Sequence, residues 1–385
     1  MFKVLTVIGA RPQIIKCAPV SRELRKVATE FLLHTGQHYD RSMSEVFFCD
    51  LSIPEPECSL SVGSGTHGYQ TGEMLKGIEA VLLREHFDVV VVYGDTNSTL
   101  AGALAAAKLH VPIAHVEAGL RSFNNHLPEE INRIITDRIA TYLFCPNESA
   151  VSNLSREGRT KGVFLVGDVM YDALHENVTT AESRSTILHD NGLRHKRYIL
   201  LTVHRPHNTD DLNALGNIIA AVMKLTGRGE TVVFPVHPRT RKQLAYFDLK
   251  NGGGLVLLEP VSYLDMLALE RHARVILTDS GGVQKEAFWL GIPCVTLRNE
   301  TEWTETVESG WNVLAGNDTG QIVRAVTRIN GNFDGRVPPI HHDIGAAKRI
   351  VAILGDELGD HASSCNRALP VHSRVRVESA NNNYE

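Results

Sequence analysis

Three acidic positions in the first half of the chain have the residue types and spacing for proton transfer. Asp95 and Glu117 each come directly after a short apolar run, and Glu129 begins a helical pattern. If the three carboxyls lie together, like-charge repulsion and partial burial raise the pKa of at least one toward the range useful for catalysis. Singly, Asp95 also fits a helix N-cap and Glu117 an ion-pair partner of Arg121. Glu129, with Glu130, also fits a favourable charge in a first helical turn, so both interpretations stay open.

A group suited to holding an anion follows the first strand pattern. Arg11, Pro12 and Lys16 come after Gly9, where a strand pattern gives way to a helical one. Glycine permits a tight turn, proline fits the first helical position, and a helix N-terminus offers unpaired N–H groups. An ordinary turn with solvated cations fits equally well. The spacing is not G-x-G-x-x-G, so no nicotinamide cofactor is indicated.

A second anion-binding pattern stands in the second half of the chain. Ser280, Gly281 and Gly282 lie between a strand pattern and a helical pattern. Bare glycine amides approach a phosphate closely, and Glu286 follows about one and a half turns later. From there its carboxylate could accept hydrogen bonds from ribose hydroxyls. An N-cap serine followed by close packing is the alternative.

Histidines follow two further strand patterns of the second half. His204 and His237 stand at the ends of these patterns, and His207 lies close to the first of them. A histidine can exchange a proton with a leaving phosphate, and a nearby arginine neutralises its charge. For His207 and His237 a structural role is the stronger interpretation. For His204 the two interpretations are equal.

Parallel sheets are needed to bring these groups together. Short Val-, Ile- and Leu-rich runs alternate with helical patterns, which is typical of βα units in a parallel sheet buried on both faces. The expected strands are Lys3–Ile8, Phe31–Thr35, Val89–Tyr93, Ile113–Val116, Tyr142–Cys145 and Val163–Val166, then Tyr198–Val203, Val232–Val236, Leu255–Leu258, Val275–Thr278 and Cys294–Leu297. The predicted fold class is α/β, with two doubly wound Rossmann-like domains facing a cleft.

The predicted boundaries follow from these two sets of strands. An N-terminal domain carrying the acids covers 1–170, and a C-terminal domain covers 171–358. The charged segment 171–196 is where a linker would sit. Residues 359–385 lose periodicity and gather asparagines, so a flexible tail is expected.

Composition excludes several classes of protein. The 385 residues carry a net charge of −5 without a long basic run, so no nucleic acid or anionic membrane is an expected partner. Arg11 cuts the first apolar run too short for a membrane span or a usual signal segment, and a cytoplasmic protein is expected. The six cysteines include no C-x-x-C pair, which indicates buried thiols rather than zinc or disulfides.

In combination, the motifs resemble those of the non-hydrolysing UDP-N-acetylglucosamine 2-epimerases, from about Lys3 to Leu358. They are Gly9-x-Arg11-Pro12-x5-Ala18-Pro19, Thr35-Gly36-Gln37-His38, Gly94-Asp95-Thr96, His115-Val116-Glu117-Ala118-Gly119-Leu120-Arg121, Pro128-Glu129-Glu130-x-Asn132-Arg133 and Thr278-Asp279-Ser280-Gly281-Gly282-x-Gln284-x-Glu286. The resemblance implies the fold of B-type glycosyltransferases, a UDP-sugar in the interdomain cleft, a homodimer, and neither metal nor cofactor.

The reaction implied by the resemblance interconverts UDP-GlcNAc and UDP-ManNAc. The C2 proton is removed and UDP leaves C1 by anti elimination, and UDP then re-adds to the trapped 2-acetamidoglucal after reprotonation on the other face. The implied catalytic residues are Asp95, Glu117, Glu129 and His204, the last assisting UDP departure. The implied binding residues are Arg11, Lys16, Arg133, Ser280, Gly281, Gly282 and Glu286, to which the strand-end position adds His237. Which acid removes the proton is open.

Two departures from the family pattern concern the substrate. Gln37-His38-Tyr39-Asp40 differs from the motif of allosterically activated members, and Trp303 stands where Thr-Glu-Arg-Pro-Glu has its arginine. These features are similar to the branch that includes 2-epimerases of UDP-2,3-diacetamido-2,3-dideoxyglucuronate, which is one alternative function. The others are a glycosyltransferase of the same fold, which needs an acceptor, a hydrolytic relative that releases free sugar, and a non-catalytic UDP-sugar sensor.

Overall fold

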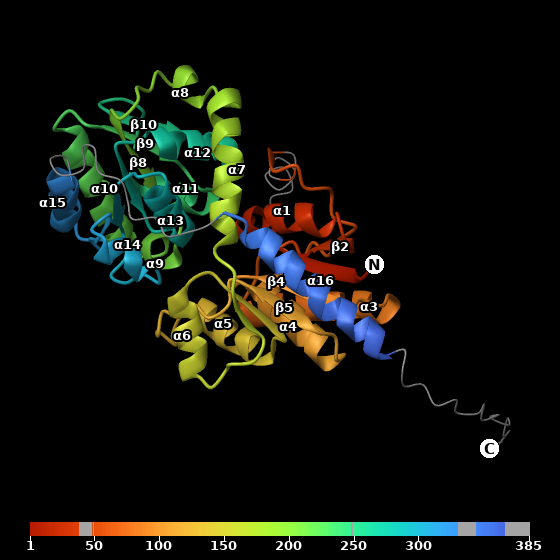
Figure 1. Cartoon of the computed structure of the whole chain (residues 1–385). Helices are drawn as coiled ribbons and strands as arrows, with labels where there is room; N and C mark the ends of the chain where they lie inside the picture. Colours follow the sequence, from red (N-terminus) through yellow and green to blue (C-terminus); the bar gives the residue numbers. More distant parts are fainter. Residues whose placement is uncertain (38–47, 49, 248, 330–343, 366–385) are drawn as a thin grey trace, which may run out of the picture.

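Two parallel-sheet α/β domains lie side by side in the computed structural model. In Figure 1 the strands of the first are red to yellow, those of the second are green to light blue, and the dark-blue C-terminal helix lies along the first. The structure describes residues 1–37, 48, 50–247, 249–329 and 344–365. The predicted fold class is confirmed. None of the helices within these ranges is both long and apolar enough to span a bilayer.

The first domain is built on a seven-stranded sheet of order β3-β2-β1-β4-β5-β6-β7. Its strands are β1 (Lys3–Ile8), β2 (Thr29–His34), β3 (Cys58–Ser59), β4 (Val89–Tyr93), β5 (Ile113–Val116), β6 (Tyr142–Cys145) and β7 (Val163–Leu165). The strand order reverses between β1 and β4, where doubly wound sheets bind ligands. A Cβ on Gly9 would come within 1.9 Å of Thr35 Oγ1 there, so glycine is what lets the two loops approach.

Alternate residues of the strands fill two separate cores in the first domain. The surrounding helices are α1 (Arg11–Leu24), α3 (His67–Arg84), α4 (Asn97–Lys108), α5 (Pro128–Ile139), α6 (Glu148–Arg156), α7 (Val169–Arg184) and α16 (Ala346–Cys365). Val4 and Ile8 share a cluster with α1, α7 and α16, whereas Leu5 and Val7 share one with α3 and α4. Each such buried side chain contributes about 1.5–3 kcal/mol, so both faces hold the sheet in place.

The second domain repeats the plan with six parallel strands, in the order β10-β9-β8-β11-β12-β13. The strands are β8 (Tyr198–Thr202), β9 (Thr231–Pro235), β10 (Leu255–Leu258), β11 (Val275–Thr278), β12 (Cys294–Thr296) and β13 (Asn312–Leu314). The helices are α9 (Pro206–Thr209), α10 (Leu212–Thr226), α11 (Pro238–Leu244), α12 (Tyr263–His272), α13 (Gly281–Trp289), α14 (Thr304–Glu308) and α15 (Thr319–Ile329), with a 3₁₀ turn at Ala245–Phe247. Here the order reverses between β8 and β11.

The connection from the first domain to the second is largely helical. The segment 171–196, where a linker is expected, contains most of α7, which runs to Arg184, and then α8 (Ile187–Asp190). α7 packs against both α1 and α12, so it is shared between the domains.

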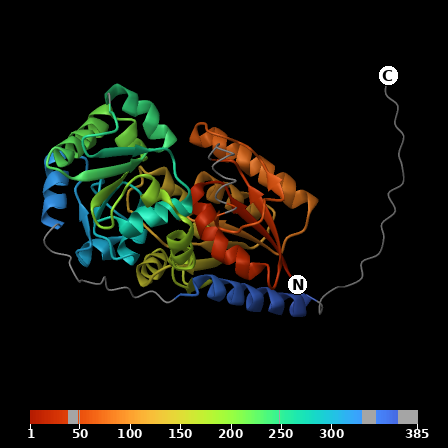
Figure 2. The same ribbon diagram turned by 90° about the horizontal axis from the view of Figure 1, so that it is seen from above.

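The position of the last helix differs from expectation, because the predicted second domain extends to residue 358. α16 packs on α1, and Figures 1 and 2 both show it along the first domain. The physical reason is that its apolar positions Ile350, Leu354 and Leu358, four residues apart, enter the core of that domain. The helix continues into the expected tail, whose residues 366–385 lie outside the described ranges.

Candidate active site

A cleft between the carboxyl ends of the two sheets collects side chains from both domains. All the predicted site residues line it except Glu129, namely Arg11, Lys16, Asp95, Glu117, Arg133, His204, His237, Ser280, Gly281, Gly282 and Glu286. Glu129 stands beside it, with its Oε1 2.8 Å from Nη1 of the cleft residue Arg205. The structure therefore brings together groups that are far apart in sequence. Residues 38–40 of the motif Gln37-His38-Tyr39-Asp40, which differs from the family pattern, lie outside the described ranges.

Asp95 faces the cleft as an ion-paired carboxylate. Its Oδ2 lies 2.5 Å from Nη2 of Arg133, which α5 presents from its buried side. Thr96, not Asp95, caps α4, so the N-cap interpretation is wrong. Burial would raise the pKa of Asp95, but Arg133, Lys16 and Arg205 outweigh burial and lower it. Asp95 is thus held in its ionised form.

The pKa of Glu117 is shifted in the opposite direction from that of Asp95. Its φ of 73° is a left-handed conformation that non-glycine residues rarely adopt, and Lys16 Nζ donates to its Oε2. Arg121, the partner considered from sequence, binds a carboxylate of α5 instead. Burial raises the pKa of Glu117 against the opposing Lys16, and repulsion from Asp168 and Asp95 adds to the rise. Two neighbouring acids displaced in opposite directions are the pattern of an acid–base pair.

His115 ties together the loops that carry these two acids. Its Nδ1 lies 2.7 Å from Asp137 Oδ1, and its Nε2 lies 2.7 Å from the carbonyl oxygen of Gly94. The imidazole therefore bridges a carboxyl group of α5 and the backbone of the loop after β4. Asp137 Oδ2 in turn accepts from the amide of Gly119, at 3.0 Å. The loops after β4 and β5 therefore share one buried anchor.

Asp279 shapes the loop after β8 in the second domain. It is fully buried and accepts from the backbone amides of His204 and Arg205, at 3.1 and 3.0 Å. These bonds present the His204 ring to the cleft, with its centroid 5.6 Å from that of His237. His207, the third histidine considered, does not line the cleft, and burial lowers its pKa.

Ser280, Gly281 and Gly282 at the start of α13 form a site suited to an anion, called the anion cradle below. Ser280 caps the helix by accepting from the Val283 amide at 3.4 Å, so the N-cap interpretation of this serine is confirmed. A Cβ on Gly281 would come within 2.5 Å of Glu302 Oε1, so a larger residue there would displace the Glu302 carboxylate. The helix N-terminus with its unobstructed amides opens toward the cleft and suits a phosphate group.

Glu286 lies behind this cradle in a group of buried polar residues. Its Oε1 accepts from Tyr263 Oη at 3.2 Å. Burial raises the pKa of Glu286 to about 7, although the nearby guanidinium of Arg11 opposes the rise. Glu270 lies deeper in the same group, and burial raises its pKa well above the ordinary value. Glu286 is therefore poised between its neutral and ionised forms.

Asp168 and Lys285 line the cleft and were not predicted. Asp168 follows β7, so the rule that strand ends carry ligand groups could have found it. Lys285 sits inside a helical pattern that gives no such signal, yet it is only 1% exposed. Its Nζ lies 2.8 Å from Glu305 Oε1 and 4.0 Å from Asp168 Oδ2.

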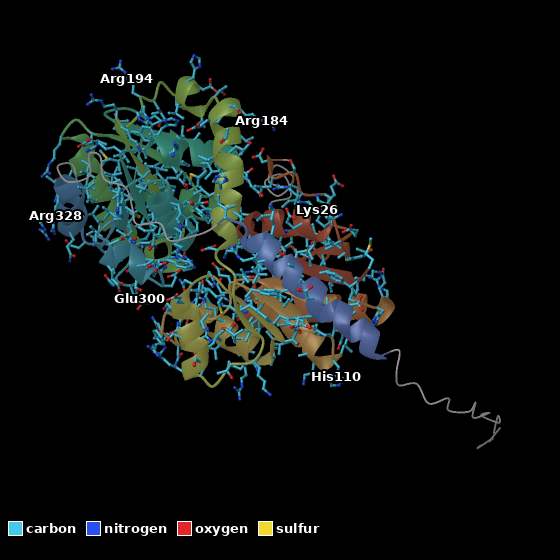
Figure 3. The ribbon with its side chains drawn as sticks, viewed as in Figure 1. Lys26, His110, Arg184, Arg194, Glu300 and Arg328 are labelled. Atoms are coloured by element: carbon cyan, nitrogen blue, oxygen red, sulfur yellow. The ribbon has the colours of Figure 1, made fainter. Side chains whose placement is uncertain are left out.

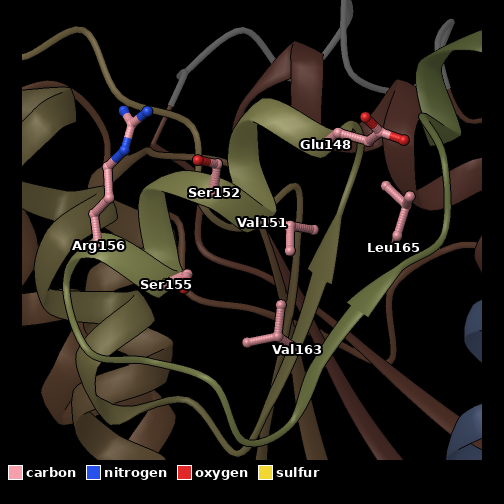
Figure 4. Close-up of a pocket in the computed structure, with 7 residues that line it drawn as sticks. All are labelled: Glu148, Val151, Ser152, Ser155, Arg156, Val163 and Leu165. Atoms are coloured by element: carbon pink, nitrogen blue, oxygen red, sulfur yellow. The ribbon is translucent and has the colours of Figure 1, made fainter.

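A different hollow lies at the outer surface between α6 and β7 (Figure 4). Val151, Val163 and Leu165 line it, and Glu148 and Arg156 stand at opposite ends. It holds none of the predicted site residues. Those residues lie in or beside the interdomain cleft instead.

Comparison with known proteins bears on the identity of this site. The family model described as UDP-N-acetylglucosamine 2-epimerase matches residues 22–355. A Methanococcus maripaludis protein named a UDP-N-acetylglucosamine 2-epimerase homolog is 54% identical over 333 residues, covering 85% of this chain and 92% of its own length. The UDP-2,3-diacetamido-2,3-dideoxy-D-glucuronate 2-epimerase of Pseudomonas aeruginosa is 49% identical, over 84% of this chain and 91% of its own.

Solved structures give the same result. The crystal structure of Methanocaldococcus jannaschii UDP-GlcNAc 2-epimerase, in complex with UDP-GlcNAc and UDP, has a TM-score of 0.85 and 44% identity. The match covers 92% of this chain and 99% of that one. The B-type glycosyltransferase architecture implied by the motifs is thereby confirmed. The chain belongs to the UDP-N-acetylglucosamine 2-epimerase family, whose members are isomerases acting on UDP-linked sugars.

Proposed function

We propose that this chain interconverts UDP-GlcNAc and UDP-ManNAc by eliminating and re-adding UDP inside the cleft. The observation that carries the proposal is the pair formed by Asp95 and Glu117, whose pKa values are displaced in opposite directions beside an anion cradle. Relatives that are named for this activity cover most of the chain, which adds support.

Inversion of C2 by two carboxyl groups requires that one is ionised and the other protonated before the reaction begins, whichever epimer is the substrate. The ionised Asp95 accepts the C2 proton from one face, and Glu117 returns a proton to the other face. As the C2–H bond breaks, its electron pair forms the C1–C2 double bond, and the C1–O bond breaks with its electrons going to UDP. Re-addition of UDP to C1 restores the saturated sugar. In the reverse direction the two acids exchange roles.

The second domain would hold the departing UDP. The amides of Gly281 and Gly282 and the hydroxyl of Ser280 would bind the diphosphate, because the Ser280 amide already donates to Thr278 Oγ1. His204 would support the developing charge of the diphosphate. Glu286 would accept from the ribose hydroxyls. Arg11 completes the positive side of this end of the cleft.

The charges around the acids favour a sugar without a carboxylate of its own. Lys16, Arg133 and Arg205 each already contact a carboxyl group, those of Glu117, Asp95 and Glu129 respectively. A uronate would add an anion where each of these cations already has an acidic partner. Turnover of UDP-GlcNAc compared with UDP-2,3-diacetamido-2,3-dideoxyglucuronate tests this preference.

Hydrogen exchange tests the reaction itself. Incubation with UDP-GlcNAc in heavy water is expected to place deuterium at C2 of both epimers, with no net loss of UDP-sugar. Product without label at C2 would reject the elimination. Accumulating free sugar and UDP would indicate hydrolysis, and a requirement for an acceptor would indicate a glycosyltransferase.

We also propose that two copies of the chain associate through α5. This helix buries Glu130, Asn132, Arg133, Thr136 and Asp137 on its inner side. Its outer side carries Ile131, Ile134 and Ile135, which are 45%, 37% and 36% exposed. Their spacing makes a continuous apolar stripe, and a second copy would cover it. The cytoplasmic location expected from composition stays a prediction.

A further inference from the structure

The indole N–H of Trp303 is a buried hydrogen-bond donor in the wall of the cleft. The side chain is only 5% exposed and lines the cleft. Its Nε1 has no hydrogen-bond partner among the residues that the structure describes. A buried N–H without a partner is unfavourable, so native proteins rarely keep one without a reason.

The position of this donor is defined by the anion cradle. A Cβ placed on Gly281 would lie 3.4 Å from Trp303 Nε1, so the indole nitrogen stands directly over that glycine. Trp303 also belongs to the same buried apolar cluster as Leu120, a cleft residue of the first domain. The donor therefore lies where the diphosphate and the sugar of a bound nucleotide would meet.

Lys285 contacts the face of the Trp303 ring and fixes its orientation. The ammonium of Lys285 lies 4.3 Å from the ring centroid of Trp303 and 5.0 Å from that of Trp289. Lys285 is itself held by Glu305 at 2.8 Å. A cation at this distance from an aromatic face is attractive, so the lysine holds the indole by its face and leaves its N–H edge free for a ligand.

We infer that Trp303 is a substrate-binding residue whose indole N–H donates to an oxygen at the diphosphate–sugar junction. The inference deepens the proposed function and rests on it. The acceptor is either an oxygen of the diphosphate or an oxygen of the sugar. The indole N–H could donate to either oxygen. UDP without its sugar would accept this hydrogen bond only if the acceptor is a diphosphate oxygen.

The test removes the N–H and keeps the ring. In Trp303→Phe an aromatic face still lies beside Lys285, and Trp289→Phe is the matched control because Trp289 contacts the same lysine but does not line the cleft. Dissociation constants for UDP and UDP-GlcNAc are measured by calorimetry, and steady-state kinetics give kcat and KM. We expect about ten-fold weaker binding in Trp303→Phe, the loss for roughly one hydrogen bond, and little change in the control.

Each outcome decides the inference. Equal weakening of UDP and UDP-GlcNAc supports it with a diphosphate acceptor, and weakening of UDP-GlcNAc alone supports it with a sugar acceptor. Wild-type affinities in Trp303→Phe overturn it, as does equal weakening in both variants, which would mean that the effect passes through Lys285. If the wild-type protein binds UDP-GlcNAc but does not exchange its C2 hydrogen, the proposed function is wrong. The inference that Trp303 donates to the bound UDP-sugar would still stand.

A second measurement needs no variant of Trp303. The chain has three tryptophans, so ¹⁵N-labelled protein gives three indole N–H signals, and Trp289→Phe and Trp311→Phe assign them by elimination. The Trp303 signal is expected to shift when UDP-GlcNAc is added, and the Trp289 signal to stay. A Trp303 signal unmoved by saturating UDP-GlcNAc overturns the inference.

Discussion

Arg205 of the second domain and Glu129 of the first meet across the cleft, with Nη1 2.8 Å from Oε1. Both side chains are about one-third exposed, so as a simple ion pair they would contribute at most about 1 kcal/mol. Their importance lies in joining the domains beside the acids. A second contact between domains, Asn124 Nδ2 to Glu300 Oε1 at 3.0 Å, is exposed, and Figure 3 labels Glu300 at the lower edge of the second domain.

If Arg205 and Glu129 act as a pair, removing either should slow turnover and removing both should add little. We expect Glu129→Gln and Arg205→Met each to lower kcat about 10-fold, and the double variant to match the slower single variant. Asn124→Ala is the control and should be near wild type. Additive losses in the double variant would mean that Glu129 acts independently, as a catalytic group in its own right.

Asp95→Asn and Glu117→Gln should each lower kcat about 10²–10⁴-fold, because each removes one partner of a proton transfer. UDP affinity should change little, since the cradle belongs to the other domain. Calorimetric titration with UDP checks this point, and Glu148→Gln in the outer hollow serves as the control. A large loss of UDP binding in either acid variant would instead assign the carboxyl a structural role.

His115→Gln should separate positioning from binding. Glutamine can replace only one of the two hydrogen bonds, to Asp137 or to the Gly94 carbonyl. We expect kcat to fall while KM for the UDP-sugar stays close to wild type, with a loss of unfolding free energy of about 1–3 kcal/mol. Thermal unfolding and steady-state kinetics measure the two effects. Unchanged kcat at reduced stability would limit His115 to a role in folding.

Glu286 should make the ligand-free protein less stable as pH rises. Burial raises its pKa from 4.5 to about 7, so between these values the folded protein holds more protons than the unfolded chain. Stability then falls with rising pH across that window. Glu286→Gln should flatten the Tm profile there, and a slope equal to that of the wild type would contradict the assignment.

The same proton should affect nucleotide binding with the opposite sign. The ionised carboxylate accepts from the two ribose hydroxyls more strongly than the protonated carboxyl group does, so UDP affinity should weaken as pH falls from about 8 to about 6. In Glu286→Gln this pH dependence should be reduced and the affinity lower throughout. Calorimetry across this range makes the measurement, and an unaltered pH profile in the variant would remove Glu286 from the ribose site.

Ile134→Glu should disrupt self-association through α5. A charge in the middle of the exposed stripe would have to be desolvated in the interface, which is unfavourable. Sedimentation should show a dimer for the wild type and a monomer for the variant. Lys76→Glu, on the exposed side of α3, is a charge-change control and should leave the assembly intact. A wild type that is monomeric at all concentrations would reject the interface.

The sequence predicted the central strands closely because buried parallel strands are continuous apolar runs. It missed β3 and β13, which are edge strands of two and three residues and leave almost no periodic signal. It also assigned α16 to the wrong neighbour, because an amphipathic pattern says that a face is buried but not against what.

The sequence likewise predicted which residues meet at the site but not which of them are paired. Strand ends identified the acids and the cradle, since topology alone brings them together. The ion pairs that set their protonation were not foreseen, because Lys16 and Glu117 are separated by 101 residues and no local pattern connects them. Trp303 was noticed only as a departure from a motif, and its buried donor is visible only in three dimensions.

The polypeptide passes from the first lobe to the second along α7 and returns ahead of α16, so two covalent crossings join the lobes. The first crossing is also a shared surface, because α7 packs on α1 of one lobe and on α12 of the other. A single proteolytic nick at either crossing would still leave the halves tethered by the other.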